Sequence, residues 1–176
     1  MNTSRHIFLQ ANTDNIMKAH GEMQIQKKKL KKKKKKSTKE LKKLKLEVVE
    51  TFEEEVLRNM LIYSQGSMSL GDPIKEFAIG VNTKERIYFT IVPLFLFVRH
   101  KLNFKGFGCT NKNIKTIPEL GSENSPVSFY IDVDPKEVSE PLPFSLEMTL
   151  HYEVAKDSWE KFDFTVDPVL RVIQDQ

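Results

Sequence analysis

The sequence lacks the features that would indicate a disulfide-linked, secreted or membrane-spanning protein. Cys109 is the single cysteine, so no disulfide can form within the chain and a reducing compartment is expected. The most apolar segment, Ile87–Val98, has only twelve residues and contains Pro93. A membrane-spanning helix needs about 20 apolar residues, and no apolar run follows the N-terminus as a secretory signal would require. We therefore expect no membrane span.

Motifs for catalysis or for binding a cofactor or metal are also missing. Cys109 has no histidine near it in sequence, so we expect a small buried or half-buried residue rather than a nucleophile. His151 has no companion at metal-ligand spacing and is expected at the surface. The acidic stretch 132–140 lacks the third ligand and the glycine of a calcium loop. The sequence thus favours a protein that is not an enzyme, with no cofactor, metal or small-molecule substrate.

What the sequence does contain is an unusual concentration of lysine. Thirteen lysines fall within Lys27–Lys45, against one acid, Glu40. This segment carries a net charge of +12 while the whole chain carries +4, so the other 157 residues carry −8. The chain therefore combines a basic arm with an acidic remainder.

A lysine run of this density indicates nuclear import, contact with nucleic acid or another polyanion, or contact with an anionic surface. No aromatic residue occurs in Lys27–Lys45, so bases would have nothing to stack on, and any contact with nucleic acid would be to phosphates. We expect a nuclear protein, with the cytoplasm as the alternative. The residues expected to contact an import receptor or polyanion are Lys27, Lys28, Lys29, Lys31, Lys32, Lys33, Lys34, Lys35 and Lys36.

The first third of the chain has a helical pattern. Neither glycine nor proline occurs from Glu22 to Gln65, and a helix is expected from Thr13 to about Ser64. Within it, Ser37 and Glu40 have the spacing of a capping box, which marks a fresh helix start at Ser37. An apolar stripe follows, formed by Leu41, Leu44, Val48, Phe52, Val56 and Met60. This stripe could pair with another chain as a short coiled coil or pack onto the protein's own head.

The second half of the chain has the alternation of β-strands. Residues Pro143–Val154 alternate between apolar and polar side chains without a break, and Val127–Val133 does the same. We expect these two to be adjacent antiparallel strands, with Phe162–Val166 as a third. Earlier strands are expected at 76–82, 87–92 and 94–98. The expected fold is α+β, built on an antiparallel sheet, with a β-sandwich as the alternative.

These patterns divide the chain into three parts. Residues 1–64 are expected to form a basic, coiled-coil-prone helical arm, 65–75 a linker rich in glycine and turn residues, and 76–176 a strand-rich head.

One short motif bears on nucleic-acid binding. Lys105–Gly108 matches the opening of an RNA-recognition signature, but Cys109 and Lys112 stand at the two aromatic positions that should follow, and Thr110 stands at the aliphatic one. Because the stacking residues are missing, we favour a glycine-rich turn after Phe104.

Residues 127–154 also resemble a known family. The strand Val127-Ser-Phe-Tyr-Ile-Asp-Val with the turn Asp134-Pro-Lys136, then Pro143-Phe-Ser-Leu146, then Tyr152-Glu-Val154, is similar to the head domain of Spc-type kinetochore subunits. This resemblance implies a small α+β head that follows a coiled coil, joins a partner head and docks onto the inner kinetochore. It implies a scaffold role in chromosome segregation.

Two functions are therefore expected from the sequence. The first is a protein-interaction or scaffold component that pairs through the apolar stripe and docks through its head. The second is a nucleic-acid-binding protein that uses the lysine arm, with the Lys105–Gly108 segment as a secondary contact.

Overall fold

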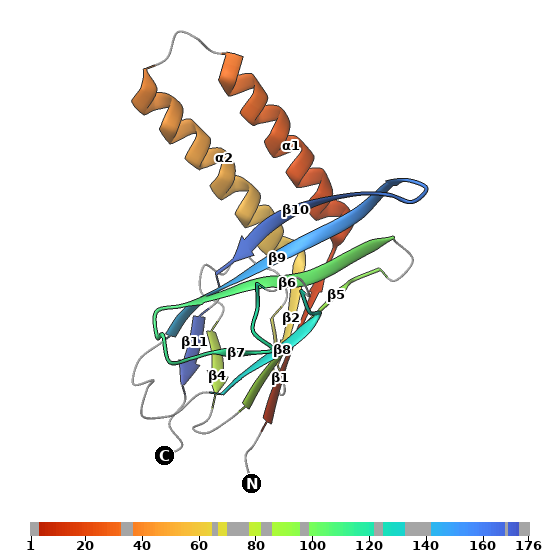
Figure 1. The fold of residues 1–176 in the computed structure, drawn as a ribbon. Coiled ribbons are helices and arrows are strands. Elements are labelled where there is room, and N and C mark those ends of the chain that lie inside the picture. Colours follow the sequence, from red (N-terminus) through yellow and green to blue (C-terminus); the bar gives the residue numbers. More distant parts are fainter. Residues whose placement is uncertain are drawn as a thin grey trace.

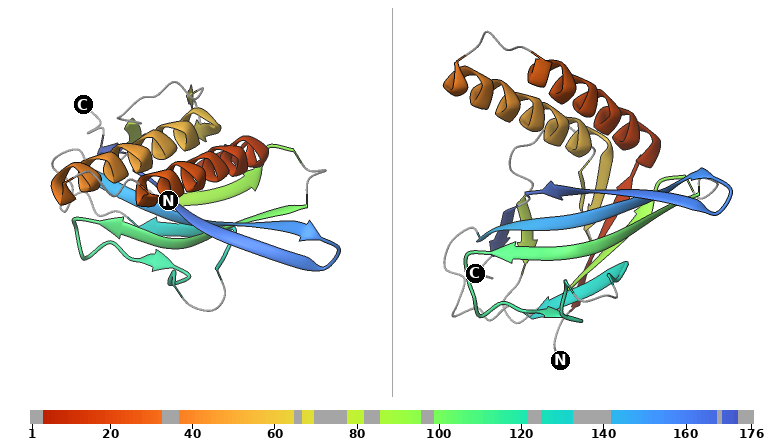
Figure 2. Two further views of the ribbon diagram at one scale, coloured as in Figure 1. Left: turned by 90° about the horizontal axis from the view of Figure 1, so that it is seen from above. Right: turned by 45° about the horizontal axis from the view of Figure 1, so that its top comes forward.

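The structure is a computed structural model that describes residues 4–32, 37–64, 67–69, 78–81, 86–95, 99–121, 125–132, 142–167 and 169–172. Two helices form a hairpin, α1 (Thr13–Lys32) and α2 (Thr38–Arg58), which stands away from a pair of sheets (Figures 1 and 2). The strands are β1 (Ser4–Ala11), β2 (Met60–Ser64), β3 (Ser67–Ser69), β4 (Ala78–Val81), β5 (Arg86–Pro93), β6 (His100–Cys109), β7 (Thr116–Ile117), β8 (Ser128–Asp132), β9 (Leu142–Ala155), β10 (Ser158–Val166) and β11 (Val169–Val172). The expected mixed α and β fold is confirmed. Neither described helix is long and apolar enough to cross a membrane.

The strands form two sheets in the part of the chain that the structure describes. The first has the order β3-β2-β1-β5-β8-β7, and the second has the order β10-β9-β11-β4, with β6 also paired to β9. In the first sheet β1 runs parallel to β5 and antiparallel to β2. The two chain segments that flank the helical hairpin are therefore neighbours in one sheet, and the hairpin is an insertion between them.

The core lies between the two sheets and continues under the base of the hairpin. Phe89 of β5 lies 5.6 Å from Phe144 of β9, and Phe104 of β6 lies 4.8 Å from Phe129 of β8, measured between ring centroids. These edge-to-face contacts join the two sheets, and such pairs stabilise a fold beyond the area they bury. The sheets therefore face each other as in a sandwich, while the helices make the whole fold mixed.

Several sequence-based expectations about the strands are confirmed. The alternation of Pro143–Val154 falls within β9, whose apolar members Leu146, Met148 and Leu150 are at most 1% exposed. The third expected strand is β10, which pairs antiparallel with β9. The segment expected at 76–82 contains β4, and the segment expected at 87–92 lies within β5. The strand expected at 94–98 falls mostly outside the described residues.

The expected pairing of the two alternating strands is wrong. β8 pairs with β5 and β7, whereas β9 pairs with β6, β10 and β11. Each of the two strands has one apolar face. Such a face can be buried beside a neighbour in the same sheet or against the facing sheet, so the alternation alone does not decide between the two arrangements.

The segment expected to be helical from Thr13 to about Ser64, with a fresh helix start at Ser37, is helical only as far as Arg58. It is divided into α1 and α2, and residues 60–64 form strand β2. The division expected at residue 64 is not followed by the sheets, since β1 and β2 from the first segment lie beside β5 from the third. β1 can take part in a sheet because Ile7, Leu9 and Ala11 alternate along it and bury one of its faces.

The glycine-rich turn expected after Phe104 is a strand instead. Lys105–Gly108 lies in β6 and pairs with β9, with a shift in register between Phe104 and Gly106. A Cβ atom on Gly108 would overlap the side chain of Ser145 on the facing strand. The glycine thus leaves room for the Ser145 side chain, which lies where a Cβ atom would be.

The capping box at the start of α2 is confirmed and gives a stability prediction. The Glu40 amide donates to Ser37 Oγ (3.3 Å), and the Ser37 amide donates to Glu40 Oε2 (3.0 Å). Ser37→Ala should lower the free energy of unfolding by about 1 kcal/mol, because it removes an acceptor for an otherwise unpaired helix amide. Urea unfolding measures the loss, with Ser37→Asp as the control that keeps a capping oxygen. Equal losses in both variants would contradict a capping role.

Candidate polyanion-binding site

The base of the helical hairpin is fixed to the sheets by apolar packing. Ile16 and Met23 of α1 and Phe52 and Val56 of α2 are all at most 8% exposed. His20 stacks on Phe162 of β10 with ring centroids 3.8 Å apart and lies edge-on to Phe52 at 5.8 Å. These contacts hold the lower half of the hairpin against the second sheet.

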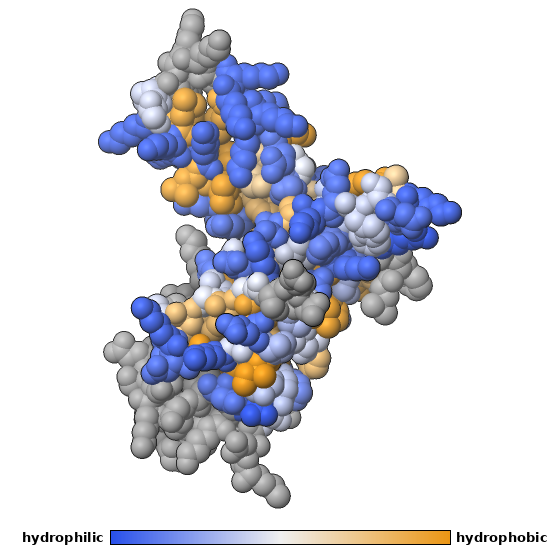
Figure 3. Space-filling model, in the orientation of Figure 1, coloured by the Kyte–Doolittle hydropathy of each residue, from blue (hydrophilic) through white to orange (hydrophobic). Residues whose placement is uncertain are grey.

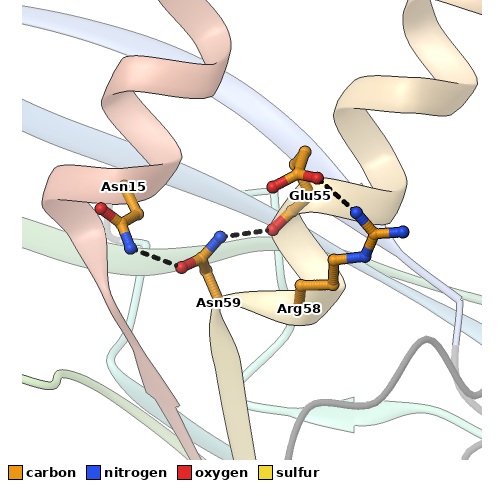
Figure 4. Close-up of polar contacts among 4 residues, drawn as sticks. All are labelled: Asn15, Glu55, Arg58 and Asn59. Atoms are coloured by element: carbon orange, nitrogen blue, oxygen red, sulfur yellow. Dashed lines mark hydrogen bonds and ion pairs between the residues drawn. The ribbon is translucent and has the colours of Figure 1, made fainter.

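A polar network closes the base of the hairpin (Figure 4). Asn15 Nδ2 of α1 donates to Asn59 Oδ1, and Asn59 Nδ2 donates to the Glu55 carbonyl, each at 2.8 Å. Arg58 Nη1 pairs with Glu55 Oε1 at 2.6 Å. The network joins the first turn of α1 to the last turn of α2, so the two helices are held side by side where they leave the sheet.

The free end of the hairpin is strongly basic. On α1, Lys28, Lys29, Lys31 and Lys32 are exposed and Lys27 is half-buried, and Lys39, Lys42, Lys43 and Lys45 of α2 are exposed beside them. Acids are scarce here: Glu40 is engaged with the cap of α2, and Lys43 lies 3.9 Å from Glu47. Hydrophilic residues cover much of the hairpin in Figure 3. The structure thus places nine lysines toward the free end of the two helices.

The lysines predicted from the sequence are only partly covered by this site. Lys33, Lys34, Lys35 and Lys36 lie outside the described residues. The sequence-based set omitted Lys39, Lys42, Lys43 and Lys45, although they belong to the same lysine-rich segment. The signal that could have included them is the capping box, because a helix that starts at Ser37 places these residues beside the end of α1.

The opposite end of α2 is acidic. Glu50, Glu53 and Glu54 line a cleft of about 440 Å³ together with Asp167, which follows β10. Burial, with Asp167 and Glu50 nearby, raises the pKa of the Glu53 carboxyl. The hairpin therefore has its positive charge at the free end and its negative charge near the sheets, so an anion is attracted to the free end.

The apolar stripe of α2 is largely used within the chain. Phe52, Val56 and Met60 are 6%, 0% and 1% exposed and belong to the protein's own core, which agrees with the second of the two roles expected for the stripe, packing within the chain. Leu41, Leu44 and Val48 are half-buried. Leu44 and Val48 line a groove of about 370 Å³ between the helices, which also contains Leu30 of α1.

The two residues weighed as reactive groups lie as expected. Cys109 is half-buried, and burial raises the pKa of its thiol, which disfavours the nucleophilic thiolate. His151 lies on the outer face of the second sheet. In the described part of the chain, no group of three or more His, Cys, Asp and Glu residues could hold a metal ion.

His20 makes the attachment of the hairpin sensitive to pH. Burial, with Lys27 nearby, lowers the pKa of His20 below its ordinary value of 6.5. The unfolded chain therefore binds a proton at higher pH than the folded protein, and stability is lost as the pH falls through about 6.5. We expect His20→Gln to reduce the loss of stability between pH 7.5 and 5, measured by urea unfolding. The pKa of His151 is also lowered, chiefly by burial. The loss of stability in His151→Gln over the same pH range therefore shows how much a second histidine contributes. An unchanged pH profile in His20→Gln would exclude this role.

The fold is one of two facing sheets that carry a helical hairpin. Comparison with known proteins finds a similar fold and no matching family. No protein-family model matches the chain, and no curated protein matches it. Among solved structures, the crystal structure of the inclusion body protein PixA from Burkholderia cenocepacia is similar, with a TM-score of 0.54. The match covers 98% of this chain and 95% of that chain at 9% sequence identity. At this identity the likeness shows the fold alone.

Proposed function

We propose that this protein acts by binding a polyanion, nucleic acid above all, through the basic free end of its helical hairpin. The observation that carries the proposal is the set of nine lysines on two adjacent helices, at the end farthest from the sheets. Each exposed lysine can neutralise a phosphate and release its counterion, which is the main source of affinity in binding that does not depend on sequence. That the protein is not an enzyme stays a prediction.

The contact is expected to be with phosphates rather than bases. Aromatic residues are absent from Lys27–Lys45, and lysine is a flexible point charge without the planar fork of arginine. Such a surface positions a protein on nucleic acid without reading its sequence. Import into the nucleus through the same lysines agrees with this function and remains a prediction.

A scaffold that binds a protein partner is the second candidate. The groove between α1 and α2 favours it, because Leu44 and Val48 remain half-buried at its edge. A kinetochore role stays a prediction from the resemblance of residues 127–154. The strands that carry this resemblance, β8 and β9, lie in different sheets.

Salt dependence of binding tests the first proposal. Binding of the full chain to a double-stranded DNA of arbitrary sequence is measured by fluorescence anisotropy between 50 and 200 mM salt. With six or more phosphate contacts, the affinity should fall by about 10³-fold over this range, and a second sequence should give the same curve. Binding that does not respond to salt, or no binding at 50 mM, would reject the proposal.

A further inference from the structure

Three basic side chains lie in register across the outer face of the second sheet. Lys101 of β6 is directly opposite His151 of β9, and His151 is directly opposite Lys161 of β10. Such cross-strand neighbours have Cβ atoms about 4.5–5.5 Å apart. Both lysines are exposed and His151 is half-buried, so their side chains form a short row open to solvent.

This row lies on a different surface from the basic end of the hairpin. Along β10, Phe162 points inward, where it contacts His20 and Phe52 of the hairpin. Lys161 is its neighbour in the strand and therefore points to the opposite face. A ligand on the row would not contact the face of β10 on which the hairpin packs.

The lysines of the row form no ion pair among the described residues, although Asp163 lies near enough to act on His151 and Lys161. The nearby carboxylates are engaged elsewhere, since Asp163 pairs with Lys105 at 2.7 Å and Glu153 with Arg99 at 2.8 Å. Among the described residues, neither Lys101 nor Lys161 has a carboxylate within ion-pair distance. Lys101 and Lys161 lie on either side of His151, so an anion above the imidazole could be reached by both ammonium groups.

Trp159 lies beside the row and is held by one of its members. Its indole is 41% exposed, and Lys101 Nζ lies 4.7 Å from the centroid of the ring. Trp159 is also the single tryptophan of the chain. Its fluorescence therefore reports the position of Lys101 without any label.

We infer that Lys101, His151 and Lys161 form a binding site for a phosphate group. Three positive or proton-accepting groups spaced along one line can surround the oxygens of one phosphate, two of them as ammonium donors and the imidazole as a third donor when protonated. The phosphate could belong to a free phosphate compound or to a nucleic-acid strand. The site is separate from the hairpin, so this inference stands whether or not the proposed function does.

The titration of His151 supplies an independent sign of occupancy. Burial lowers its pKa first, and Lys161 and Lys101 lower it further, while Asp163 of β10 acts in the opposite direction. An anion between the lysines reverses the local field, so it should raise the pKa of His151 and bind more tightly when His151 is protonated. Hydrogen bonds from Arg99 and Lys105 lower the pKa values of the neighbouring carboxyls Glu153 and Asp163, so both stay ionised while His151 titrates.

The first experiment follows Trp159 fluorescence of the full chain during titration with inorganic phosphate, pyrophosphate and a short single-stranded oligonucleotide. A saturable change is expected, and Lys101→Gln and Lys161→Gln should each weaken binding up to about fivefold, as one exposed ion pair contributes. Lys156→Gln, in the turn that joins β9 to β10, is the matched control and should leave the affinity unchanged. The probe that saturates at the lowest concentration identifies the source of the phosphate. No fluorescence change with any probe, or equal weakening in Lys156→Gln and the row variants, would overturn the inference.

The second experiment uses sulfate, whose charge is constant between pH 5 and 8. Binding should strengthen as the pH falls through the pKa of His151, and this dependence should be lost in His151→Gln while binding at pH 8 is retained. The pKa of His151, followed by NMR, should rise when sulfate is added. A pKa that does not move at saturating sulfate would exclude the row as the site. Because DNA binding by the hairpin is measured separately by anisotropy, failure of one proposal leaves the other intact.

Discussion

Replacing Lys28, Lys29, Lys31 and Lys32 with glutamine is expected to weaken DNA binding about a thousandfold at 0.1 M salt. Each lysine that neutralises a phosphate adds about 0.9 to the slope of log affinity against log salt, so removal of four contacts lowers that slope by about 3.6. Taken from a reference of 1 M salt, where the two affinities are set equal, this change in slope lowers the affinity at 0.1 M salt by between three and four orders of magnitude. The four residues are exposed on α1, and glutamine is compatible with a helix, so the fold should be retained.

The control for this variant carries the same change in net charge elsewhere. Lys18, Lys112, Lys115 and Lys156 are exposed lysines away from the free end of the hairpin, and their joint replacement by glutamine also removes four positive charges. If binding depends on the hairpin, this control should lower the affinity only slightly. Equal weakening in both variants would show that net charge, rather than the hairpin, determines binding.

The parts of the fold that could be predicted from the sequence are those determined by local spacing. The alternation of Phe144, Leu146 and Met148 fixes one buried face of β9, and the structure buries that face. The hydroxyl of Ser37 and the carboxylate of Glu40 are three residues apart, which is enough to predict the start of α2. In each case the determining groups are within one strand or one helical turn.

Pairing between distant strands could not be predicted in the same way. β1 lies beside β5 although about 80 residues separate them, and the hairpin occupies part of that interval. The alternation of Ile7, Leu9 and Ala11 was present in the sequence, but it shows only that one face is buried, not which strand lies alongside. The same limit explains why β8 and β9 were expected to be neighbours and instead lie in different sheets.

The candidate sites follow the same division. The lysine-rich segment is visible in the sequence because its members are close together along the chain. The row of Lys101, His151 and Lys161 is not, because its members come from three strands and acquire their relation from the register of β6, β9 and β10. His20 was missed for a similar reason, since its partner Phe162 is more than a hundred residues away.

The apolar stripe of α2 shows how a pattern can be recognised correctly while its partner is not. Its spacing predicts a buried helix face, and a face of this kind serves equally well for a coiled coil or for the protein's own core. The structure uses Phe52, Val56 and Met60 internally and leaves Leu41, Leu44 and Val48 half-buried near the free end. The two halves of the stripe should therefore respond differently to the same substitution.

Val56→Glu is expected to lower the free energy of unfolding by about 4 kcal/mol or more, whereas Leu44→Glu should lower it by about 1 kcal/mol. Val56 is 0% exposed in the core beneath the hairpin, where a carboxylate has no partner and must be desolvated or protonated. Leu44 lines the open groove between the helices, where a glutamate side chain can reach water. Urea unfolding gives both values, and sedimentation of the Leu44→Glu variant tests for pairing between chains. If the stripe pairs with a second copy, Leu44→Glu should turn an oligomer into a monomer. If it serves the protein's own core, the sedimentation of that variant should match that of the unmodified chain, and the large loss of stability should be confined to Val56→Glu.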